Sequence, residues 1–263
     1  MPADPSIAVP ELLRAAYTSW RWTAASAYPR QMTWRLDCDR ATHYLKVGVA
    51  GEYPGLLAEA RRTRWAAPFL SVAPVIDHGS DGTVALLVTA AITGRPATDP
   101  TLGRPADVVV ALAEGLRRFH HHAPIDHCPF AFHLDHALEH VRRRVAAGSV
   151  DPGAEFHDEH CYLRTATAAL DELERLCPDR EDVVVCHGDY CSPNVLLDGG
   201  QVVGYVDLGE LAAADRWWDL AVGTWSTTWN FGPGLESLFL SAYGARPDPD
   251  RQAFYRLLFD LAS

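Results

Sequence analysis

The sequence predicts an α+β fold of two lobes: a small, β-rich lobe over residues 1–92 and a larger, mainly helical lobe over residues 93–263. Short apolar runs separated by turn residues fill the first ninety positions, which is typical of strands. Apolar residues recur at helical spacing through most of the remainder. The glycine and proline within residues 93–96 mark the change between the two patterns.

The first lobe is predicted to hold a sheet and one helix. Residues 31–36 and 42–48 are predicted to form a strand hairpin, because only a short polar run separates them. Residues 56–65 carry good helix formers and are bounded by proline and glycine, which predicts a helix. Residues 72–77 and 83–89 are further predicted strands, joined by a glycine-containing turn.

The second lobe is predicted to combine long helices with a few short strands. Apolar residues at helical spacing predict helices at 106–120, 134–145 and 165–176. Three short runs rich in valine, leucine or tyrosine predict strands at 183–186, 195–197 and 202–206. Helices are then expected to continue to the C-terminus.

The charge balance limits the partners that the chain can bind. It has 34 acidic and 23 basic residues, and its formal net charge is -11. A nucleic-acid-binding protein needs a basic surface, so we expect no nucleic-acid partner. An acidic surface suits a cationic ligand, but solubility alone explains the same balance.

The sequence carries no recognisable targeting, membrane or disulfide pattern. No apolar run approaches the roughly 20 residues that cross a bilayer, and the first ten residues lack the pattern of a secretory signal. The six cysteines contain no C-x-x-C pair, so we expect a reduced cytoplasmic protein without a disulfide framework or zinc site. His120, His121 and His122 invite a metal hypothesis, but they end a predicted helix, where a structural role is favoured.

The most informative pattern is a loop after one predicted strand and a turn after another. Asp189 follows the strand at 183–186, Asn194 comes five residues later, and Asp207 follows the apolar run of 202–206. Phosphoryl transfer needs a carboxylate that orients the attacking hydroxyl, and oxygen ligands that hold Mg²⁺ against the phosphates. A single H-G-D or D-L-G tripeptide is more often a turn or cap, but the spaced combination favours this chemistry.

The pattern His-Gly-Asp-x-x-x-x-Asn, which contains Asp189 and Asn194, and the later Asp-Leu-Gly at Asp207 resemble the aminoglycoside phosphotransferases. These enzymes are distant relatives of protein kinases, and the resemblance covers residues 106–258 well. It implies a two-lobed protein-kinase-like fold, with ATP as cofactor, GTP left open, and Mg²⁺. It also implies that Asp189 is the catalytic base, that Asn194 and Asp207 are Mg²⁺ ligands, and that acids in 211–221 brace the catalytic loop.

The resemblance extends more loosely to nucleotide-binding residues in the first lobe. Lys46 resembles the strand lysine that pairs with the nucleotide phosphates, and Glu59 on the predicted helix resembles its ion-pair partner. Residues 23–28 correspond to the nucleotide loop; they contain no glycine, and Ser26 is the candidate for phosphate contact. The connector after the last predicted strand would offer backbone groups to adenine, from Thr89 and Ala91.

The resemblance also places candidate residues for binding the acceptor. They are Glu155, Asp158, Glu159, Trp229 and Asp260. The first three correspond to an acidic substrate-binding loop, whose carboxylates would pair with ammonium groups; a solvated helix start explains them equally well. Trp225 and Trp229 fit either an aromatic wall or the protein core. Asp260 is the acid that remains where the 3′-phosphotransferases end in a more acidic segment.

The resemblance implies a phosphotransferase that acts on the 3′- or 3″-hydroxyl of an aminoglycoside, a cationic antibiotic, and so confers resistance. The sequence departs from close relatives at Glu210, where they carry arginine. Two alternatives stay open: a kinase of another hydroxylated natural product, such as a nucleoside or peptide antibiotic, or of a small metabolite; and a catalytically inactive kinase-like binding module. The sequence fits a monomer or a homodimer equally.

Overall fold

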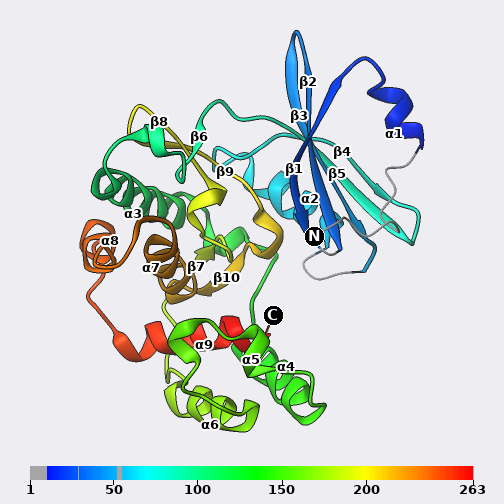
Figure 1. Ribbon diagram of the computed structural model, residues 1–263. Helices are drawn as coiled ribbons and strands as arrows, with labels where there is room; N and C mark the ends of the chain where they lie inside the picture. Colours follow the sequence, from blue (N-terminus) through cyan, green and yellow to red (C-terminus); the bar gives the residue numbers. More distant parts are fainter. Residues whose placement is uncertain (1–10, 29, 52–54, 263) are drawn as a thin grey trace.

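The computed structural model describes residues 11–28, 30–51 and 55–262. It confirms the predicted α+β fold of two lobes (Figure 1). A twisted antiparallel sheet forms most of the smaller lobe, and helices that surround a few short strands form the larger one.

The sheet of the smaller lobe holds the first five strands in the order β1-β2-β3-β5-β4. They are β1 (Arg21–Tyr28), β2 (Gln31–Cys38), β3 (Ala41–Val49), β4 (Val75–Ser80) and β5 (Val84–Ala90). Side chains alternate between the two faces of a strand. Along β3, Leu45 and Val47 therefore pack in a cluster with Leu13 of α1 (Glu11–Ala16), whereas Lys46 reaches Glu59 of α2 (Leu56–Ala66).

One expectation for this lobe is wrong. Residues 23–28 are not a loop but lie within β1, which pairs with β2 along its length. The segment lacks the glycine, asparagine and aspartate of turns, and its backbone groups pair with the neighbouring strand instead. A bulge at Ala25 interrupts the pairing, which shifts register between Ala24 and Ser26. The strand predicted at 72–77 also begins later, at Val75.

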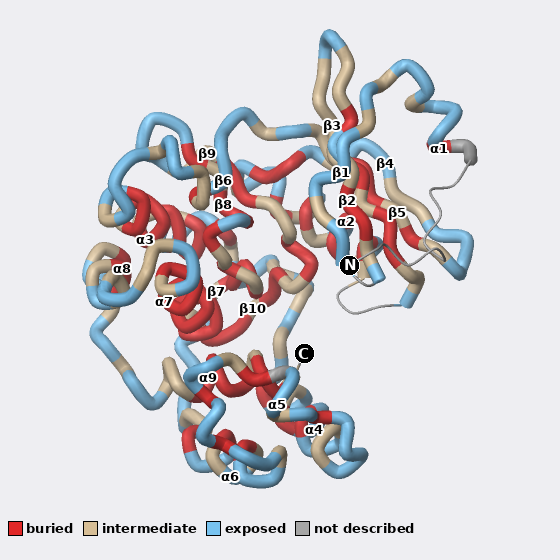
Figure 2. The backbone as a smooth tube through the Cα atoms, viewed as in Figure 1, coloured by how far each residue is buried: buried red, intermediate tan, exposed pale blue. Residues whose placement is uncertain are grey.

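The larger lobe is built around one apolar core (Figure 2). Its helices are α3 (Pro105–His122), α4 (Leu134–Ala146), α5 (Pro152–Glu155), α6 (Ala166–Leu176), α7 (Trp217–Phe231), α8 (Glu236–Tyr243) and α9 (Pro249–Ala262). Its strands are β6 (Arg95–Pro96), β7 (Val183–Cys186), β8 (Val195–Asp198), β9 (Gln201–Tyr205) and β10 (Ala212–Asp215). Short 3₁₀ turns link them: η1 (Pro100–Leu102), η2 (Ile125–His127), η3 (Asp158–His160), η4 (Ser192–Asn194) and η5 (Leu208–Glu210).

The pairing of β7 with β10 was not predicted, although it fixes the start of the loop that carries Asp189. The β10 sequence, Ala-Ala-Ala-Asp, favours a helix by intrinsic propensity. Its register with β7, from Cys186 opposite Ala212 to Val183 opposite Asp215, overrides that preference. In the part of the chain that the structure describes, no helix is both long and apolar enough to span a bilayer.

Gly115 of α3 is where the helix meets the strands beneath the active site. A Cβ at this position would lie 2.5 Å from Cγ2 of Val202 and 3.2 Å from Oη of Tyr190. Gly115→Ala is expected to lower the free energy of unfolding by about 1–2 kcal/mol, because the overpacking outweighs the helix propensity of alanine. Urea unfolding measures this; Gly79→Ala, which meets nothing within 4 Å, is the control and should change little. An unchanged Gly115→Ala would contradict the packing described.

Candidate active site

The predicted catalytic residues converge on one loop and one turn. The loop after β7 carries Asp189, and η4 ends it at Asn194. The side-chain amide of Asn194 donates from Nδ2 to Oδ2 of Asp189 at 2.8 Å, and to the Asp189 carbonyl at 3.0 Å. The Val206 amide donates to the Asn194 carbonyl at 3.0 Å, which brings Asp207 beside the loop. Residues far apart in the sequence are thus joined by direct hydrogen bonds.

Asp207 has an unusual backbone conformation. Its φ of 62° and ψ of 51° make it the one non-glycine residue in the left-handed region among those described. Such a conformation costs energy, and it tends to persist at functional sites where surrounding contacts hold it. Here the holding contact is Lys46, whose Nζ lies 2.5 Å from Oδ1 of Asp207 and 2.8 Å from Oε1 of Glu59. One ammonium therefore joins β3, α2 and the turn after β9.

The environment of Lys46 keeps it charged. Burial alone would lower the pKa of Lys46, but attraction to Asp207 and Glu59 outweighs this effect and raises it. Burial raises the pKa of Glu59, and the nearby ammonium opposes that rise. A charge buried at this depth is stable only while its partners are present. The three side chains are therefore energetically dependent on one another.

The sheet register gathers the other predicted nucleotide-binding residues around Lys46. Ser26 pairs with Thr33, and Thr33 pairs with Lys46, so these three side chains form one row on the face that carries Lys46. Thr89 of β5 pairs with Tyr44, two residues before Lys46 and on the same face. Tyr44 therefore lies on the same face of the sheet as Lys46.

The predicted connector offers fewer free groups than expected. The Ala91 amide already donates to the Thr42 carbonyl at 2.9 Å, and the Ala90 amide donates to Pro74 at 2.9 Å. Both amides therefore bond to backbone groups of the smaller lobe. Neither can donate to the adenine ring unless that bond is broken. The backbone carbonyl groups, which accept hydrogen bonds, are the groups that the predicted connector could still offer to adenine.

Asp219, near the start of α7, holds the backbone of the loop that carries Asp189. Its buried carboxylate accepts hydrogen bonds from the amides of His187, at 2.6 Å, and Gly188, at 2.9 Å. Nε2 of His120 donates to the same carboxylate at 2.9 Å, while Nδ1 of His120 lies 2.8 Å from the Tyr243 hydroxyl. Helices α3, α7 and α8 therefore support the backbone on which Asp189 sits.

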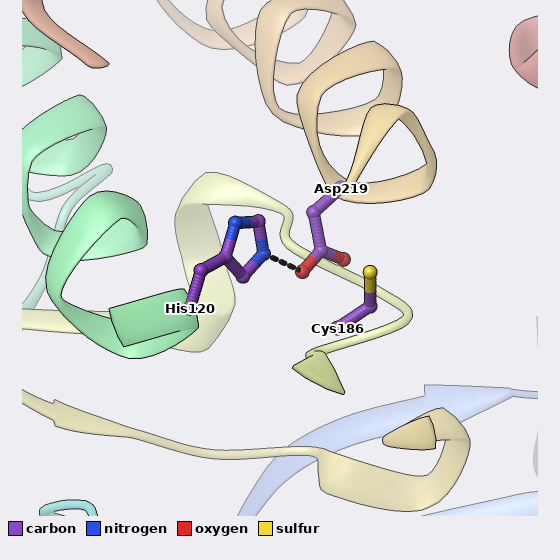
Figure 3. Close-up of side chains that lie close together, drawn as sticks. All are labelled: His120, Cys186 and Asp219. Carbon is purple, nitrogen blue, oxygen red and sulfur yellow. Dashed lines mark hydrogen bonds and ion pairs between the residues drawn. The ribbon is translucent and has the colours of Figure 1, made fainter. Parts of the chain in front are cut away.

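Figure 3 shows His120, Asp219 and Cys186 close together, and three such ligand types raise the possibility of a metal site. Both carboxylate oxygens of Asp219 and both nitrogens of His120 have protein partners, as described above. The Cys186 thiol donates to the Asp215 carbonyl at 3.3 Å, and burial raises its pKa well above the ordinary value, so it stays protonated. A protonated thiol is a poor ligand, and the geometry is that of a structural brace.

Glu210 lies against the same loop from the opposite side. Gly188 has a φ of 90°, and a Cβ there would lie 2.6 Å from Cβ of Glu210, so the loop and the turn need glycine to approach so closely. Burial raises the pKa of Glu210 to about 7; the negative charge of Asp189 adds to the rise, and Arg62 opposes it. Arg62 on α2 also donates to the Leu211 carbonyl at 2.9 Å. Arg62 of α2 therefore supplies the positive charge beside the turn that contains Glu210.

The candidate acceptor residues lie around α7 and α9, and two of the five are paired with other side chains. Asp260 is buried and accepts from the ring nitrogens of His157, at 2.5 Å, and His160, at 2.6 Å. Glu159 is partly exposed and pairs with Arg256 at 2.8 Å. Asp158 and Trp229 are exposed, and the side chain of Glu155 lies outside what the structure describes.

The sequence analysis missed the basic partners of these acids. Arg256 of α9 is almost fully buried and also pairs with Glu236 at 2.9 Å. His157 and His160 stand on either side of Glu159, in a segment that the analysis described only by its acids. No spacing rule joins residues 100 positions apart, so these pairs become visible only in three dimensions.

Comparisons with known proteins place this geometry in a family. A family model described as the phosphotransferase enzyme family matches residues 25–255. An aminoglycoside 3′-phosphotransferase from Streptomyces fradiae is 42% identical over 214 residues, covering 77% of this chain and 78% of the relative. The chain belongs to the aminoglycoside phosphotransferase family. It is therefore a phosphotransferase with a hydroxyl acceptor, as predicted.

Three further proteins show how similar the chain is to other aminoglycoside phosphotransferases. A streptomycin 3″-kinase from Streptomyces griseus is 35% identical over 228 residues, covering 82% of this chain and 83% of that protein. A solved aminoglycoside 3′-phosphotransferase of type VIII aligns with a TM-score of 0.82 at 36% identity, covering 95% and 96% of the two chains. An enzyme from Streptomyces rimosus, solved with ADP and streptomycin, aligns with a TM-score of 0.77 at 28% identity, covering 96% of both chains. The predicted kinase-like fold is confirmed.

The hydrogen bonds between Asp219 and the loop that carries Asp189 yield a first prediction for activity. The backbone amides of His187 and Gly188 now donate to the two charged oxygens of the Asp219 carboxylate. In Asp219→Asn, one of these amides would face a side-chain NH₂ group, which cannot accept, and the other would face an uncharged oxygen. We expect kcat to fall about a hundredfold through misplacement of Asp189, and the free energy of unfolding to fall by about 3 kcal/mol. Steady-state kinetics and urea unfolding measure both effects. Asp250→Asn, on the exposed start of α9, is the matched control; equal behaviour of the two variants would refute the bracing role.

Glu210 yields a prediction for pH dependence. Its pKa is raised from 4.5 to about 7 in the folded chain, so its contribution to stability is full at pH values below about 4.5 and is lost as pH rises through 7. Relative to wild type, Glu210→Gln should gain about 2–3 kcal/mol in free energy of unfolding between pH 5 and pH 8. Urea unfolding across this range tests it. Glu139→Gln on the exposed face of α4 is the control, and parallel curves for Glu210→Gln and wild type would contradict the raised pKa.

Proposed function

We propose that this chain transfers the γ-phosphoryl group of ATP to the 3′- or 3″-hydroxyl of an aminoglycoside antibiotic and thereby inactivates it. The observation that carries the proposal is the connected set Asp189, Asn194, Asp207, Lys46 and Glu59, joined by hydrogen bonds from 2.5 to 3.0 Å. The relatives named as 3′-phosphotransferase and streptomycin 3″-kinase support the acceptor class. We also propose that residues 1–92 form the nucleotide-binding lobe, that residues 93–263 form the catalytic and substrate-binding lobe, and that the protein works in the cytoplasm.

In this mechanism the carboxylate of Asp189 orients the acceptor hydroxyl and takes its proton as the oxygen attacks phosphorus. The hydrogen bond from Asn194 Nδ2 to Oδ2 holds this carboxylate in place. The ammonium of Lys46, fixed by Glu59, neutralises charge on the phosphates. Positioning and electrostatics therefore supply most of the catalysis.

The residues present suit a magnesium ion. Because Nδ2 of Asn194 faces Asp189, its side-chain oxygen remains for a cation, and the Asp207 carboxylate lies one residue beyond the Val206 amide that bonds Asn194. A carboxylate and an amide oxygen are the kind of donors that Mg²⁺ takes alongside phosphate oxygens and water. When bound, Mg²⁺ would neutralise the charge that develops on the phosphate oxygens.

The decisive experiment for the proposed function is a coupled assay of ADP release with Mg²⁺-ATP and a panel of acceptors. The panel holds kanamycin, neomycin, streptomycin and hygromycin, with nucleoside and peptide antibiotics for comparison. Turnover of an aminoglycoside, with the phosphate located by NMR at a 3′- or 3″-oxygen, is the expected result. Turnover only of another class would replace the acceptor. Bound ATP with no turnover of any compound would favour a binding module.

The role of Asp189 is tested by Asp189→Ala. We expect kcat to fall at least a thousandfold, because the variant has no group to accept the proton, while the dissociation constant for ATP changes by less than about threefold. Coupled kinetics and calorimetry measure the two quantities. Asp198→Ala, on an exposed position at the end of β8, is the control and should retain activity. Near-normal turnover by Asp189→Ala would remove the proposed base.

A further inference from the structure

An aromatic stack, formed by His157, Trp225 and Trp229, lies at the acceptor side of the larger lobe. The rings of His157 and Trp229 are nearly parallel, at an interplanar angle of 16° with centroids 4.8 Å apart. The Trp225 ring lies 4.8 Å from that of Trp229 and 4.5 Å from that of His157. Trp225 is buried, whereas Trp229 is 42% exposed and the His157 side chain 37% exposed. Ring surface therefore remains accessible at one end of the stack.

The stack lies next to the loop that carries Asp189. Ser226, on α7 between the two tryptophans, accepts a hydrogen bond from the Ser192 amide at 2.8 Å and donates to the Ser192 hydroxyl at 3.0 Å. Residues three apart on a helix are neighbours on its surface, so Trp229 adjoins the position that contacts the loop. An acceptor whose hydroxyl reaches Asp189 would extend toward this stack.

Two of the acids beside the stack, Asp260 and Glu159, are held by side chains of the chain itself, whereas Asp158 is exposed. Both oxygens of Asp260 are taken by His157 and His160, and the carboxyl is buried. Glu159 is held by Arg256. An ammonium group is compact and strongly hydrated, so it needs free acceptors to replace its water. A guanidinium is flat and weakly hydrated, and it binds well to ring faces.

The chain already uses this stack to hold a guanidinium. The Arg256 guanidinium carbon lies 5.4 Å from the centroid of Trp225, within the range of a cation–π contact. Arg256 thereby occupies the buried end of the stack. Its accessible end, at Trp229, offers the same ring chemistry to a ligand from solvent.

We propose that Trp229 and His157 form a subsite for a guanidinium group of the acceptor, and that Trp229 sets a preference for guanidinium-bearing over ammonium-only aminoglycosides. The proposal rests on the proposed function for the identity of the acceptor, but the binding preference itself does not require turnover. Ring stacking takes the place that ion pairs with Asp260 and Glu159 would otherwise fill.

The test compares Trp229→Leu, which keeps apolar bulk, with Trp229→Phe, which keeps a ring. The probes are streptomycin, which carries guanidinium groups, and kanamycin, which carries only ammonium groups. Calorimetry on the ADP-bound enzyme gives their dissociation constants, and the coupled assay gives turnover and KM for ATP. Phe69→Ala removes a comparably exposed aromatic ring elsewhere and is the control. Melting temperatures confirm that each variant is folded.

We expect Trp229→Leu to weaken streptomycin binding about tenfold, and Trp229→Phe to weaken it less than about threefold. Kanamycin binding and KM for ATP should stay within about twofold in both variants. Failure of wild type to bind streptomycin, an equal loss for both drugs, or no loss in Trp229→Leu would each overturn the inference. If streptomycin binds through Trp229 but no compound is phosphorylated, the proposed function fails and the inference stands.

Discussion

The ammonium of Lys46 is the interaction on which the active site depends. It joins a strand of the smaller lobe to Glu59 on α2 and to Asp207 on the turn of the larger lobe. Removing Lys46 would leave the buried carboxylate of Glu59 without its partner, which is costly, so the ammonium holds the three elements in a single arrangement. The left-handed backbone of Asp207 is tolerated because this contact and the loop around it hold the residue in place.

A second set of contacts makes the loop rigid from the opposite side. Asp219 accepts hydrogen bonds from two backbone amides of the loop, and His120, itself hydrogen-bonded to Tyr243, orients that carboxylate. The loop is therefore fixed by charge-assisted hydrogen bonds rather than by its own sequence preferences. Preorganisation of this kind lets Asp189 meet a hydroxyl without reorganising at the moment of reaction.

The sequence predicted the parts of the site that depend on short-range order. Asp189, Asn194 and Asp207 follow strands whose apolar pattern is recognisable, whereas Lys46 and Glu59, thirteen residues apart, are indicated by the resemblance to the aminoglycoside phosphotransferases. The predictions from the sequence failed where pairing with a distant segment decides the structure. Residues 23–28 became a strand through pairing with β2, and Ala212–Asp215 became one through pairing with β7, against its helix propensity. The pairs of Asp260 with His157 and His160 are equally invisible to local patterns.

The sequence differs from its relatives at Glu210 and in the C-terminal segment that contains Asp260, and both differences have the same physical explanation. At Glu210, the positive charge that relatives carry in the turn is supplied from α2 by Arg62, and burial raises the pKa of the glutamate so that its own charge is partly removed. At the C-terminus, Asp260 keeps its carboxylate but histidines surround it. In both places the partners of the carboxylate come from distant segments, so acceptor preference must be argued from those contacts rather than from a count of acidic residues.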